Sequence, residues 1–471
     1  MVIKELFRKK YYESECSVFE PKLGVLDLTS IGIGAIIGAG IFVITGKVAA
    51  NYAGPAVVLS FILAGVTTAI SALIYSELST RYPVAGSAYS YTYATLGEIL
   101  AWLVGWNLVL EYGLSVAAVS AGWSGYMRSI LEKELGLSIP KVISGAYEPQ
   151  KGTYFDLFAF LAVLVVFGLL YRGVKESARV NLFIVMVKLF TLGLFLATGL
   201  FFIGIDLSNL TPFIPPPGKN SMGEDAYGWF GILRAASIVI FAYLGFDAVS
   251  TVAEEAKNPT KTVPLGIMFA MLISTFLYIS VSFTLTGIAP YKELDVAEPL
   301  AKAMYMHSHT LIGNIIAIGA IITITSVMIT MGLGFTRVVY ALARDGLLFS
   351  KLAEIHPKYK TPHVATLVGG LFIALIAGFV PLTQLAELVN VGTLFAYFTV
   401  GVAVLYLRLK KAPPCGYTVP MAYLLVPINL FLIMLVVSAL PALTWKRFLL
   451  WCLIGMAIYI LYGYKNARRQ A

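Results

Sequence analysis

Charged residues are scarce in this sequence of 471 residues, where Asp, Glu, Lys and Arg make up 13% and hydrophobic residues 59%. Soluble globular domains carry about 25% charged residues, so the composition excludes an ordinary soluble enzyme. It also excludes an intrinsically disordered chain, which requires low hydrophobicity and high net charge. The composition therefore indicates a protein whose surroundings are mostly lipid.

Cysteine and histidine are scarce as well. The three cysteines, Cys16, Cys415 and Cys452, lie far apart and form no Cys-x-x-Cys pair. The four histidines show no spacing that is typical of metal ligands. No nucleophile beside a general base is recognisable either. We therefore expect no disulfide framework, no metal site, no cofactor and no enzymatic activity.

The few charges leave long uncharged runs, and each is long enough for a membrane-crossing helix of about 20 apolar residues. The runs are 48–76, 262–291, 303–336, 361–386 and 412–445. The sequence thus predicts an all-α polytopic membrane protein. Twelve transmembrane helices are expected, at about 26–45, 55–76, 92–121, 154–171, 179–205, 230–253, 263–288, 311–336, 364–383, 386–407, 419–440 and 447–464.

The distribution of basic residues predicts the orientation of these helices. With the N-terminus inside, the inner segments hold 22 Lys and Arg and the outer ones 10. Because basic residues accumulate on the cytoplasmic side, we expect both termini to lie in the cytoplasm. The number of helices is then expected to be even. The net charge of +9 is then explained by membrane orientation, without a nucleic acid partner. The segment Met1–Pro21 lacks the apolar run of a removable signal peptide.

The first predicted helix contains four glycines within nine residues, from Gly32 to Gly40. Glycine costs about 1 kcal/mol relative to alanine inside a helix, so the cluster weakens the helix near the midplane. Tight helix packing is the other interpretation, because Gly34 and Gly38 have the close-approach spacing. A dinucleotide-binding loop is excluded, since no strand precedes the glycines.

The sixth predicted helix is interrupted in a similar way by Phe241–Asp247, where Gly245 lies close to an acid. If helices 1–5 and 6–10 form two halves, the two interruptions occupy matching positions. Such pairs of interrupted helices are the best sequence indication of a transporter binding site. Broken helices expose N–H groups that suit a carboxylate and carbonyls that suit an ammonium. A small zwitterion is therefore the expected ligand.

Glu111, Lys188 and Asp247 lie deep within predicted spans, and Glu387 and Arg234 lie nearer a span end. A charge in the centre of a span costs roughly 2.5–3.5 kcal/mol and usually faces a cavity or partner. Glu111 is expected either to form a structural ion pair or to face the cavity. Lys188 is expected either to pair with an acid or to exchange a proton, since burial disfavours its charged form. Arg234 is expected to extend to the outer interface, and Glu387 to cap the start of helix 10.

Several stretches together resemble the cationic amino acid transporter family of the amino acid–polyamine–organocation (APC) superfamily. They are Gly34–Phe42, Tyr75–Tyr91, Trp106–Gly113, Phe241–Pro259, Arg337–Leu347 and Val391–Phe398. The resemblance implies a LeuT-type fold, in which two inverted five-helix repeats with broken helices 1 and 6 are followed by two peripheral helices. The expected number of twelve helices resembles that of prokaryotic members of the family, since animal members have fourteen.

This resemblance implies a division of the chain into six parts. They are a cytoplasmic N-terminal segment 1–25, the first repeat 26–205, an extracellular loop 206–229, the second repeat 230–407, helices 11 and 12 at 408–464, and a cytoplasmic tail 465–471.

The resemblance also implies roles for residues at the two interruptions. Substrate-binding residues are expected to be Ile36, Gly38, Ala39, Gly40, Glu111, Phe241, Ala242, Tyr243, Leu244 and Phe246. Glu111 is expected to attract a cationic side chain, and Lys188 and Asp247 to take part in proton coupling. Ala39 departs from the many relatives that carry Ser or Thr there, which leaves the backbone alone to bind the carboxylate.

These observations favour a plasma-membrane importer of amino acids, with arginine, lysine and ornithine favoured, that is coupled to protons and works by alternating access. A broad neutral amino acid permease or an exchanger is the main alternative. A non-transporting amino acid sensor, a membrane enzyme and a channel fit less well. The expected partners are an amino acid, protons and the lipid bilayer, and the sequence leaves an accessory subunit undetermined.

Overall fold

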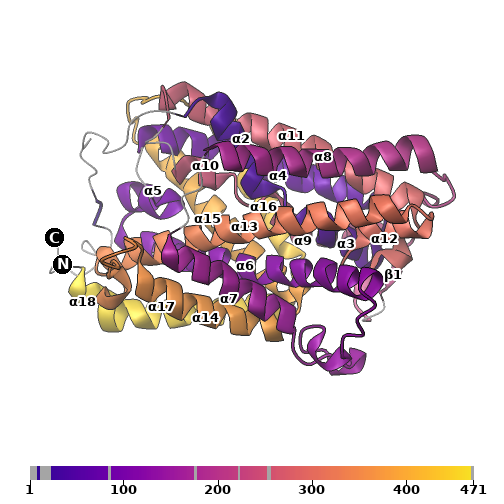
Figure 1. Cartoon of the computed structure of the whole chain (residues 1–471). Coiled ribbons are helices and arrows are strands. Elements are labelled where there is room, and N and C mark those ends of the chain that lie inside the picture. The colour runs from indigo at the N-terminus through magenta and orange to yellow at the C-terminus, as the bar shows by residue number, and fades with distance from the viewer. Residues whose placement is uncertain are drawn as a thin grey trace.

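A computed structural model describes residues 8–10, 23–82, 86–173, 178–220, 223–251 and 256–467. The chain is mostly helical, and its long helices run roughly along one axis of an elongated bundle (Figure 1). The helices are α2 (Val25–Ile36), α3 (Thr45–Val48), α4 (Val57–Arg81), α5 (Ser87–Thr95), α6 (Glu98–Glu134), α7 (Leu157–Arg172), α8 (Ala178–Ala197), α9 (Gly228–Val239), α10 (Asp247–Thr251), α11 (Pro259–Ile288), α12 (Pro299–Met306), α13 (Thr310–Arg344), α14 (His363–Phe379), α15 (Leu382–Leu409), α16 (Ala422–Ser438), α17 (Ala442–Ile458) and α18 (Tyr464–Asn466).

Shorter π or 3₁₀ segments join or extend several of these helices. They are η1 (Gly40–Ile44), η2 (Ala49–Ala53), η3 (Gly54–Ala56), η4 (Lys141–Ile143), η5 (Pro149–Lys151), η6 (Thr198–Ile203), η7 (Ile240–Tyr243), η9 (Tyr291–Leu294), η10 (Ser350–Ala353) and η11 (Tyr459–Gly463). Strands β1 (Gly218–Lys219) and β2 (Asp225–Ala226) pair as an antiparallel hairpin in the proline-containing connection before α9.

Eight helical segments among the described residues are long and apolar enough to cross a membrane. One of them, Val25–Arg81, contains a break and a turn, and α7, α14 and α16 are apolar but shorter. The prediction of a polytopic helical membrane protein is confirmed at this level. Burial separates central from outer helices: Gly228–Ser250 is 89% buried across its most apolar window and Ala442–Asn466 only 22%. Exposed apolar side chains such as Phe183 and Leu453 cover the outer helices, as expected for contact with lipid.

Two helices extend further than predicted. Residues 122–134 were expected in an outer loop, but they continue α6 to Glu134. No proline interrupts this stretch, and the Tyr126 hydroxyl donates to the Phe42 carbonyl oxygen at 2.7 Å, which holds the extension against the bundle. In the same way, α13 continues past the predicted residue 336 to Arg344.

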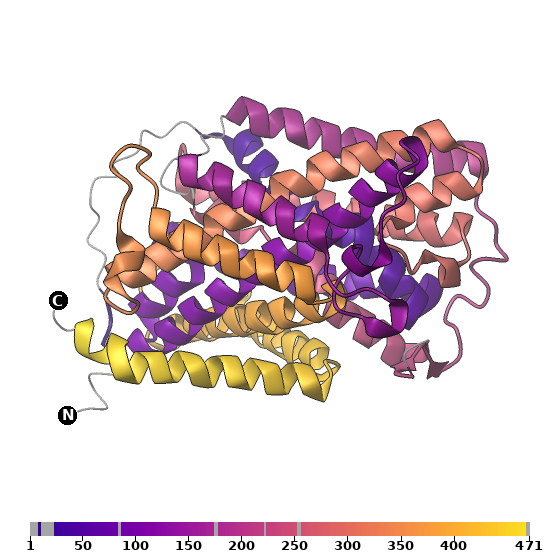
Figure 2. The ribbon, with the colours of Figure 1, turned by 60° about the horizontal axis from the view of Figure 1, so that its bottom comes forward.

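The two ends of the bundle can be named by their elements. One end, here called the α5 end, carries α5, α10 and α18, and the opposite end, here called the α3 end, carries α3, α12 and the β1–β2 hairpin (Figure 1). The turned view shows α17 along the edge of the bundle (Figure 2). Helix α6 crosses the centre, where it packs against α13 and α15, and α11 packs against α2 and α4.

Candidate functional site

The first predicted interruption is a break between α2 and η1. Helix α2 ends at Ile36, and Ile37 has an extended backbone with φ −75° and ψ 108°. Helical geometry resumes at Gly40. The N–H groups of Gly38 and Ala39 donate no backbone hydrogen bond to any described residue. Free N–H groups at the start of a helix suit an anionic ligand group.

The second predicted interruption is a break between η7 and α10. The 3₁₀ segment η7 ends at Tyr243, and Leu244 is extended with ψ 145°. Gly245 has φ +109°, a conformation that favours glycine. Helix α10 then begins at Asp247. The Leu244 N–H still donates to the Phe241 carbonyl oxygen at 3.4 Å, and the extended Leu244 together with the positive φ of Gly245 separates η7 from α10.

The two breaks lie against one another. A Cβ atom on Gly40 would overlap the Cα and Cβ atoms of Ala242. A Cβ atom on Gly245 would lie 2.8–2.9 Å from atoms of Ala35. The glycine cluster also packs tightly elsewhere, because a Cβ atom on Gly38 would lie 2.9 Å from Val327 Cγ2. Both interpretations of the glycines thus hold, since they interrupt the helix and also permit close approach.

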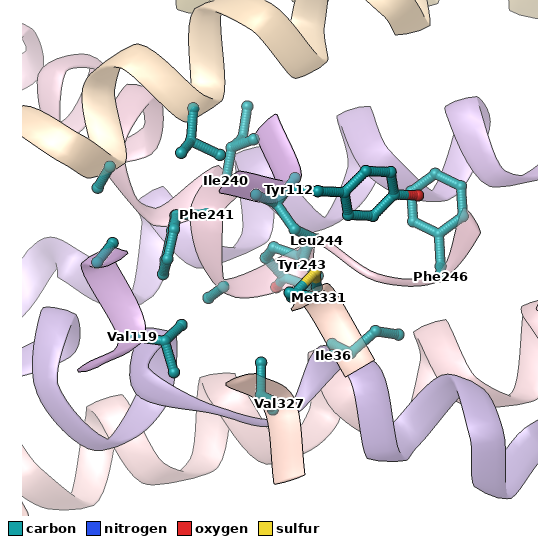
Figure 3. Packing of buried hydrophobic residues seen from close by; sticks show 14 of the residues in the cluster. Ile36, Tyr112, Val119, Ile240, Phe241, Tyr243, Leu244, Phe246, Val327 and Met331 are labelled. Carbon is teal, nitrogen blue, oxygen red and sulfur yellow. The ribbon is translucent and has the colours of Figure 1, made fainter. Parts of the chain in front are cut away.

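A small cavity lies between the breaks and two central helices, α6 and α13. Its lining residues are Ala35, Ile36, Gly38, Ala39, Gly40, Ser115, Val119, Phe241, Leu244, Val327 and Met331. Figure 3 shows Val119, Phe241, Val327 and Ile36 arranged around a common space. Apart from backbone groups and the Ser115 hydroxyl, the lining is apolar. The Ser115 hydroxyl is buried and has no hydrogen-bond partner among the described residues.

Six of the ten predicted substrate-binding residues line this cavity: Ile36, Gly38, Ala39, Gly40, Phe241 and Leu244. Ala242, Tyr243, Phe246 and Glu111 lie outside the lining. Five lining residues were missed: Ala35, Ser115, Val119, Val327 and Met331. Ser115 and Val119 follow Glu111 at intervals of four residues, so the helical period alone could have placed them on one face of α6.

A tyrosine that the sequence analysis missed connects the two breaks. The Tyr278 hydroxyl of α11 lies 2.9 Å from the Ile36 carbonyl oxygen and 2.7 Å from the Ala242 carbonyl oxygen. Tyr278 is fully buried. A buried hydroxyl requires a partner, so the single tyrosine in the uncharged stretch 263–288 was the available signal.

Lys188 of α8 is fully buried beside the first break. Its ammonium group donates to the carbonyl oxygen of Gly34, and to that of Ile37 at 3.1 Å. Carbonyls at the end of a helix lack intrahelical partners, so a cation at this position satisfies them. Lys188 is therefore in direct contact with the backbone that shapes the cavity, although it does not line the cavity itself.

Glu111 and Asp247 lie close together on the side of the breaks that leads to the α5 end. Both are buried, with 3% and 2% exposure, and they interact electrostatically. The Tyr112 hydroxyl donates to Asp247 Oδ2, whereas Asp247 Oδ1 has no hydrogen-bond partner in the described part of the chain. Thr393 of α15 lies next to Glu111, and its hydroxyl donates to the Val389 carbonyl oxygen at 3.0 Å. The two acids thus form a separate buried cluster beside the cavity.

Aromatic side chains surround this acidic cluster. Phe246 packs against Tyr75 and Tyr397, with ring centroids 5.4 and 5.3 Å apart. The Tyr243 hydroxyl donates to the Phe61 carbonyl oxygen at 2.8 Å, so its polar end is engaged by α4. A role of Tyr243 or Phe246 in substrate binding stays a prediction.

The interpretations of Arg234 and Glu387 were wrong. Arg234 does not extend to an interface: it is 4% exposed and donates to the Glu387 carboxylate. Glu387 also accepts from the Thr444 hydroxyl at 2.6 Å, and the guanidinium group lies 5.1 Å from the Tyr52 ring centroid. A buried charge requires a partner. Arg234 and Glu387, which are 153 positions apart, are partners of one another.

Comparisons with known proteins identify relatives of this chain. Residues 23–458 match the model of a family described as "Amino acid permease". A methylthioribose transporter of Bacillus subtilis is 42% identical over 99% of both chains. A branched-chain amino acid permease of the same organism is 43% identical over 95% of this chain and 94% of its own. The vacuolar cationic amino acid transporter 4 of Arabidopsis thaliana is 38% identical over 84% of this chain and 64% of its own.

Proposed function

Since this chain belongs to the amino acid permease family, we propose that it moves amino acids with neutral aliphatic side chains across the membrane by alternating access. The cavity lining supports this proposal, because the side chains of Val119, Val327 and Met331 are apolar and no charged side chain lines the cavity within the described residues. The N–H groups at Gly38 and Ala39 suit the carboxylate of the substrate.

The ammonium group of such a substrate would be bound by uncharged oxygens. Carbonyl groups at the two breaks and the unpartnered Ser115 hydroxyl are the nearby acceptors. A zwitterion needs no formal charge in its site when both ends meet backbone dipoles. The name of the branched-chain amino acid permease supports the same substrate class.

Transport of cationic amino acids is the second candidate. Glu111 supports it, because this buried acid precedes Ser115 by one helical turn and lies beside Asp247 without a basic residue among its described electrostatic partners. The side chain of a bound arginine or lysine could reach Glu111 only if it passed beyond the present lining. The geometry therefore favours the neutral substrates.

Proton coupling is proposed to depend on Lys188 and Asp247. A lysine that is fully buried against backbone carbonyls can change the hydrogen bonding at the first break when it loses its proton. Loss of the proton removes the charge that complements the end of α2. Asp247 would respond at the second break, which is in contact with the first.

The finer architecture is part of the same proposal. If Val25–Arg81 crosses the membrane twice and the three shorter apolar helices cross once each, the eight candidate segments become twelve spans. The proposal also includes two inverted repeats of five helices and the six-part division of the chain. It further includes a plasma-membrane location with both termini in the cytoplasm. The matching positions of the two breaks support this arrangement.

Uptake into proteoliposomes tests the substrate class. Radiolabelled leucine, alanine, arginine and methylthioribose would be supplied with and without proton or sodium gradients. We expect leucine and alanine to enter faster than arginine, and a proton gradient to accelerate them. Faster arginine or methylthioribose uptake would contradict the proposed substrate. Counterflow without net uptake would indicate an exchanger, and binding without flux a sensor.

Glu111→Gln separates the two substrate candidates. Under the neutral proposal, the variant changes leucine and arginine uptake by the same factor, because Glu111 does not touch either side chain. A selective loss of arginine and lysine transport would instead assign the cationic side chain to Glu111. Thr393→Val is a matched control, since it removes a hydroxyl next to Glu111 and keeps the acid.

A further inference from the structure

A second cavity lies toward the α3 end of the bundle. Its lining comprises Ile44, Lys47, Val48, Asn51, Tyr52, Ile238 and Thr383. These residues come from the helical run that follows the first break, from α9 and from α15. The lining therefore combines three aliphatic side chains with an ammonium group, a hydroxyl, an amide and a phenol.

The second cavity continues the line of the central one. Gly40 lines the central cavity and Ile44, four residues later, lines the second. On the facing helix, Phe241 lines the central cavity and Ile238, three residues earlier, lines the second. Because an α-helix rises 1.5 Å per residue, the two cavities are offset by about 5 Å along both helices. This offset is comparable to the length of a small amino acid.

Lys47 is the cation of the second cavity. It is partly buried, and within the described chain its ammonium group forms neither a hydrogen bond nor an ion pair. Asp295 is the acid with the largest electrostatic effect on Lys47, yet the two form no ion pair. A partly buried charge without a partner is costly, so an anion from outside would find a favourable place here.

The acids near this cavity already have partners of their own. Glu224 accepts a hydrogen bond from the Tyr52 hydroxyl at 2.8 Å. Glu387 accepts from Arg234 and from Thr444. Their negative charge is thus engaged elsewhere, and Lys47 is left to interact with a ligand.

We propose that the second cavity is a loading site that binds the carboxylate of an incoming amino acid on Lys47, with the aliphatic side chain against Ile44, Val48 and Ile238. This inference rests on the proposed function, because it takes a neutral amino acid as the transported ligand. The offset between the cavities allows the amino acid to leave Lys47 and to enter the central cavity by a movement of about one helical turn.

Equilibrium binding of tritiated leucine to the purified full-length protein tests the proposal. We expect the wild type to bind two leucines per chain. Val119→Trp fills the central cavity and should leave one bound leucine per chain. Adding Lys47→Gln to this variant should remove that leucine, whereas adding Lys47→Arg should keep it. Val119→Trp without any bound leucine, or Lys47→Gln with both leucines bound, would overturn the loading site. A wild type that binds no leucine contradicts the proposed substrate itself.

Uptake kinetics give a second readout that does not depend on counting sites. Lys47→Gln is expected to raise the KM for leucine about tenfold, because a hydrogen bond to a charged group is lost, while kcat stays within about twofold. Lys302→Gln is the matched control, since that lysine of α12 donates to the Glu293 carbonyl oxygen at 2.7 Å and lies outside the lining of the second cavity. Equal KM values for both variants would refute the role of Lys47.

Two competitors identify the ligand group. Leucinamide lacks the carboxylate and should not displace the leucine that depends on Lys47. Replacing chloride by gluconate should leave this binding unchanged. The site does not recognise a carboxylate if leucinamide displaces the bound leucine as well as unlabelled leucine does. The same conclusion holds if chloride, at a concentration equal to that of leucine, displaces the bound leucine.

Discussion

The two helix breaks carry opposite charges and use them differently. Lys188 lies beside the end of α2 and donates to two backbone carbonyls. Asp247 is the first residue of α10 and accepts from the Tyr112 side chain. Each charge suits the helix end beside it, since cations are favoured at helix C-termini and anions at N-termini. At the first break, a side-chain ammonium group thus satisfies backbone carbonyls. At the second break, a side-chain carboxylate accepts from another side chain.

This difference predicts unequal sensitivity. Removing Lys188 leaves buried carbonyls without a donor, and such groups are costly in a membrane. Removing the Asp247 charge deprives the Tyr112 hydroxyl of its acceptor and also affects the neighbouring backbone N–H groups of Gly245 and Ala248. The first break should therefore lose its shape more readily than the second, unless the contact between them makes both fail together.

Gly40→Val is the largest perturbation, because it affects both breaks. The valine side chain would overlap Ala242, and overpacking of this kind costs about 1–3 kcal/mol or more. We expect leucine binding, measured by scintillation proximity, to be lost. Gly193→Val in α8 is the control, since no atom lies within 4 Å of a Cβ atom there. Normal binding by Gly40→Val would show that the breaks do not form one site.

Lys188→Ala should reduce proton-driven leucine uptake about 100-fold, which corresponds to the ~3 kcal/mol of a hydrogen-bonded buried charge. The response of the remaining uptake to an imposed pH gradient should disappear. Uptake into proteoliposomes at several inside and outside pH values provides the measurement. A variant that keeps the full response would disprove the proton-carrier role, and thermal unfolding of the purified protein distinguishes this from misfolding.

Asp247→Asn should have the smallest effect, a decrease in uptake of about fivefold to tenfold. Asparagine keeps an oxygen that accepts from Tyr112, so only the additional ~1 kcal/mol of a charged acceptor is lost. Asp247→Leu, which removes the acceptor, should lose considerably more, and both are measured by leucine uptake. If Asp247→Asn abolished pH dependence as Lys188→Ala does, the two breaks would contribute equally to coupling.

Much of the fold was predictable, because membrane helices depend on local composition. Runs without charge mark the apolar helices, the glycine cluster marks the break near Gly38, and the single Gly245 beside an acid marks the other break. The extension of α6 to Glu134 was not predictable from hydropathy, since an amphipathic helix beyond the apolar run resembles a loop in composition. Its position against the bundle depends on contacts such as that of Tyr126 with Phe42.

The candidate site was predictable only in part. The interruption followed from the weakness of glycine in helices, and the roles of Gly38, Ala39 and Gly40 followed from the resemblance to the cationic amino acid transporter family. The direction of Glu111 did not follow, because the rotation of α6 is set by its packing against α13 and α15. The predicted acid therefore lies in a cluster with Asp247, and Ser115 lies in the cavity instead.

By itself the sequence determined that this protein lies in a membrane, where its spans are and where two of them are interrupted, because hydrophobicity and glycine content act locally along the chain. Only the tertiary structure decided which groups meet: Tyr278 with two carbonyls, Arg234 with Glu387, and Lys188 with the first break. Pairings between residues far apart in sequence depend on how the helices rotate and pack, and local composition carries no information about that.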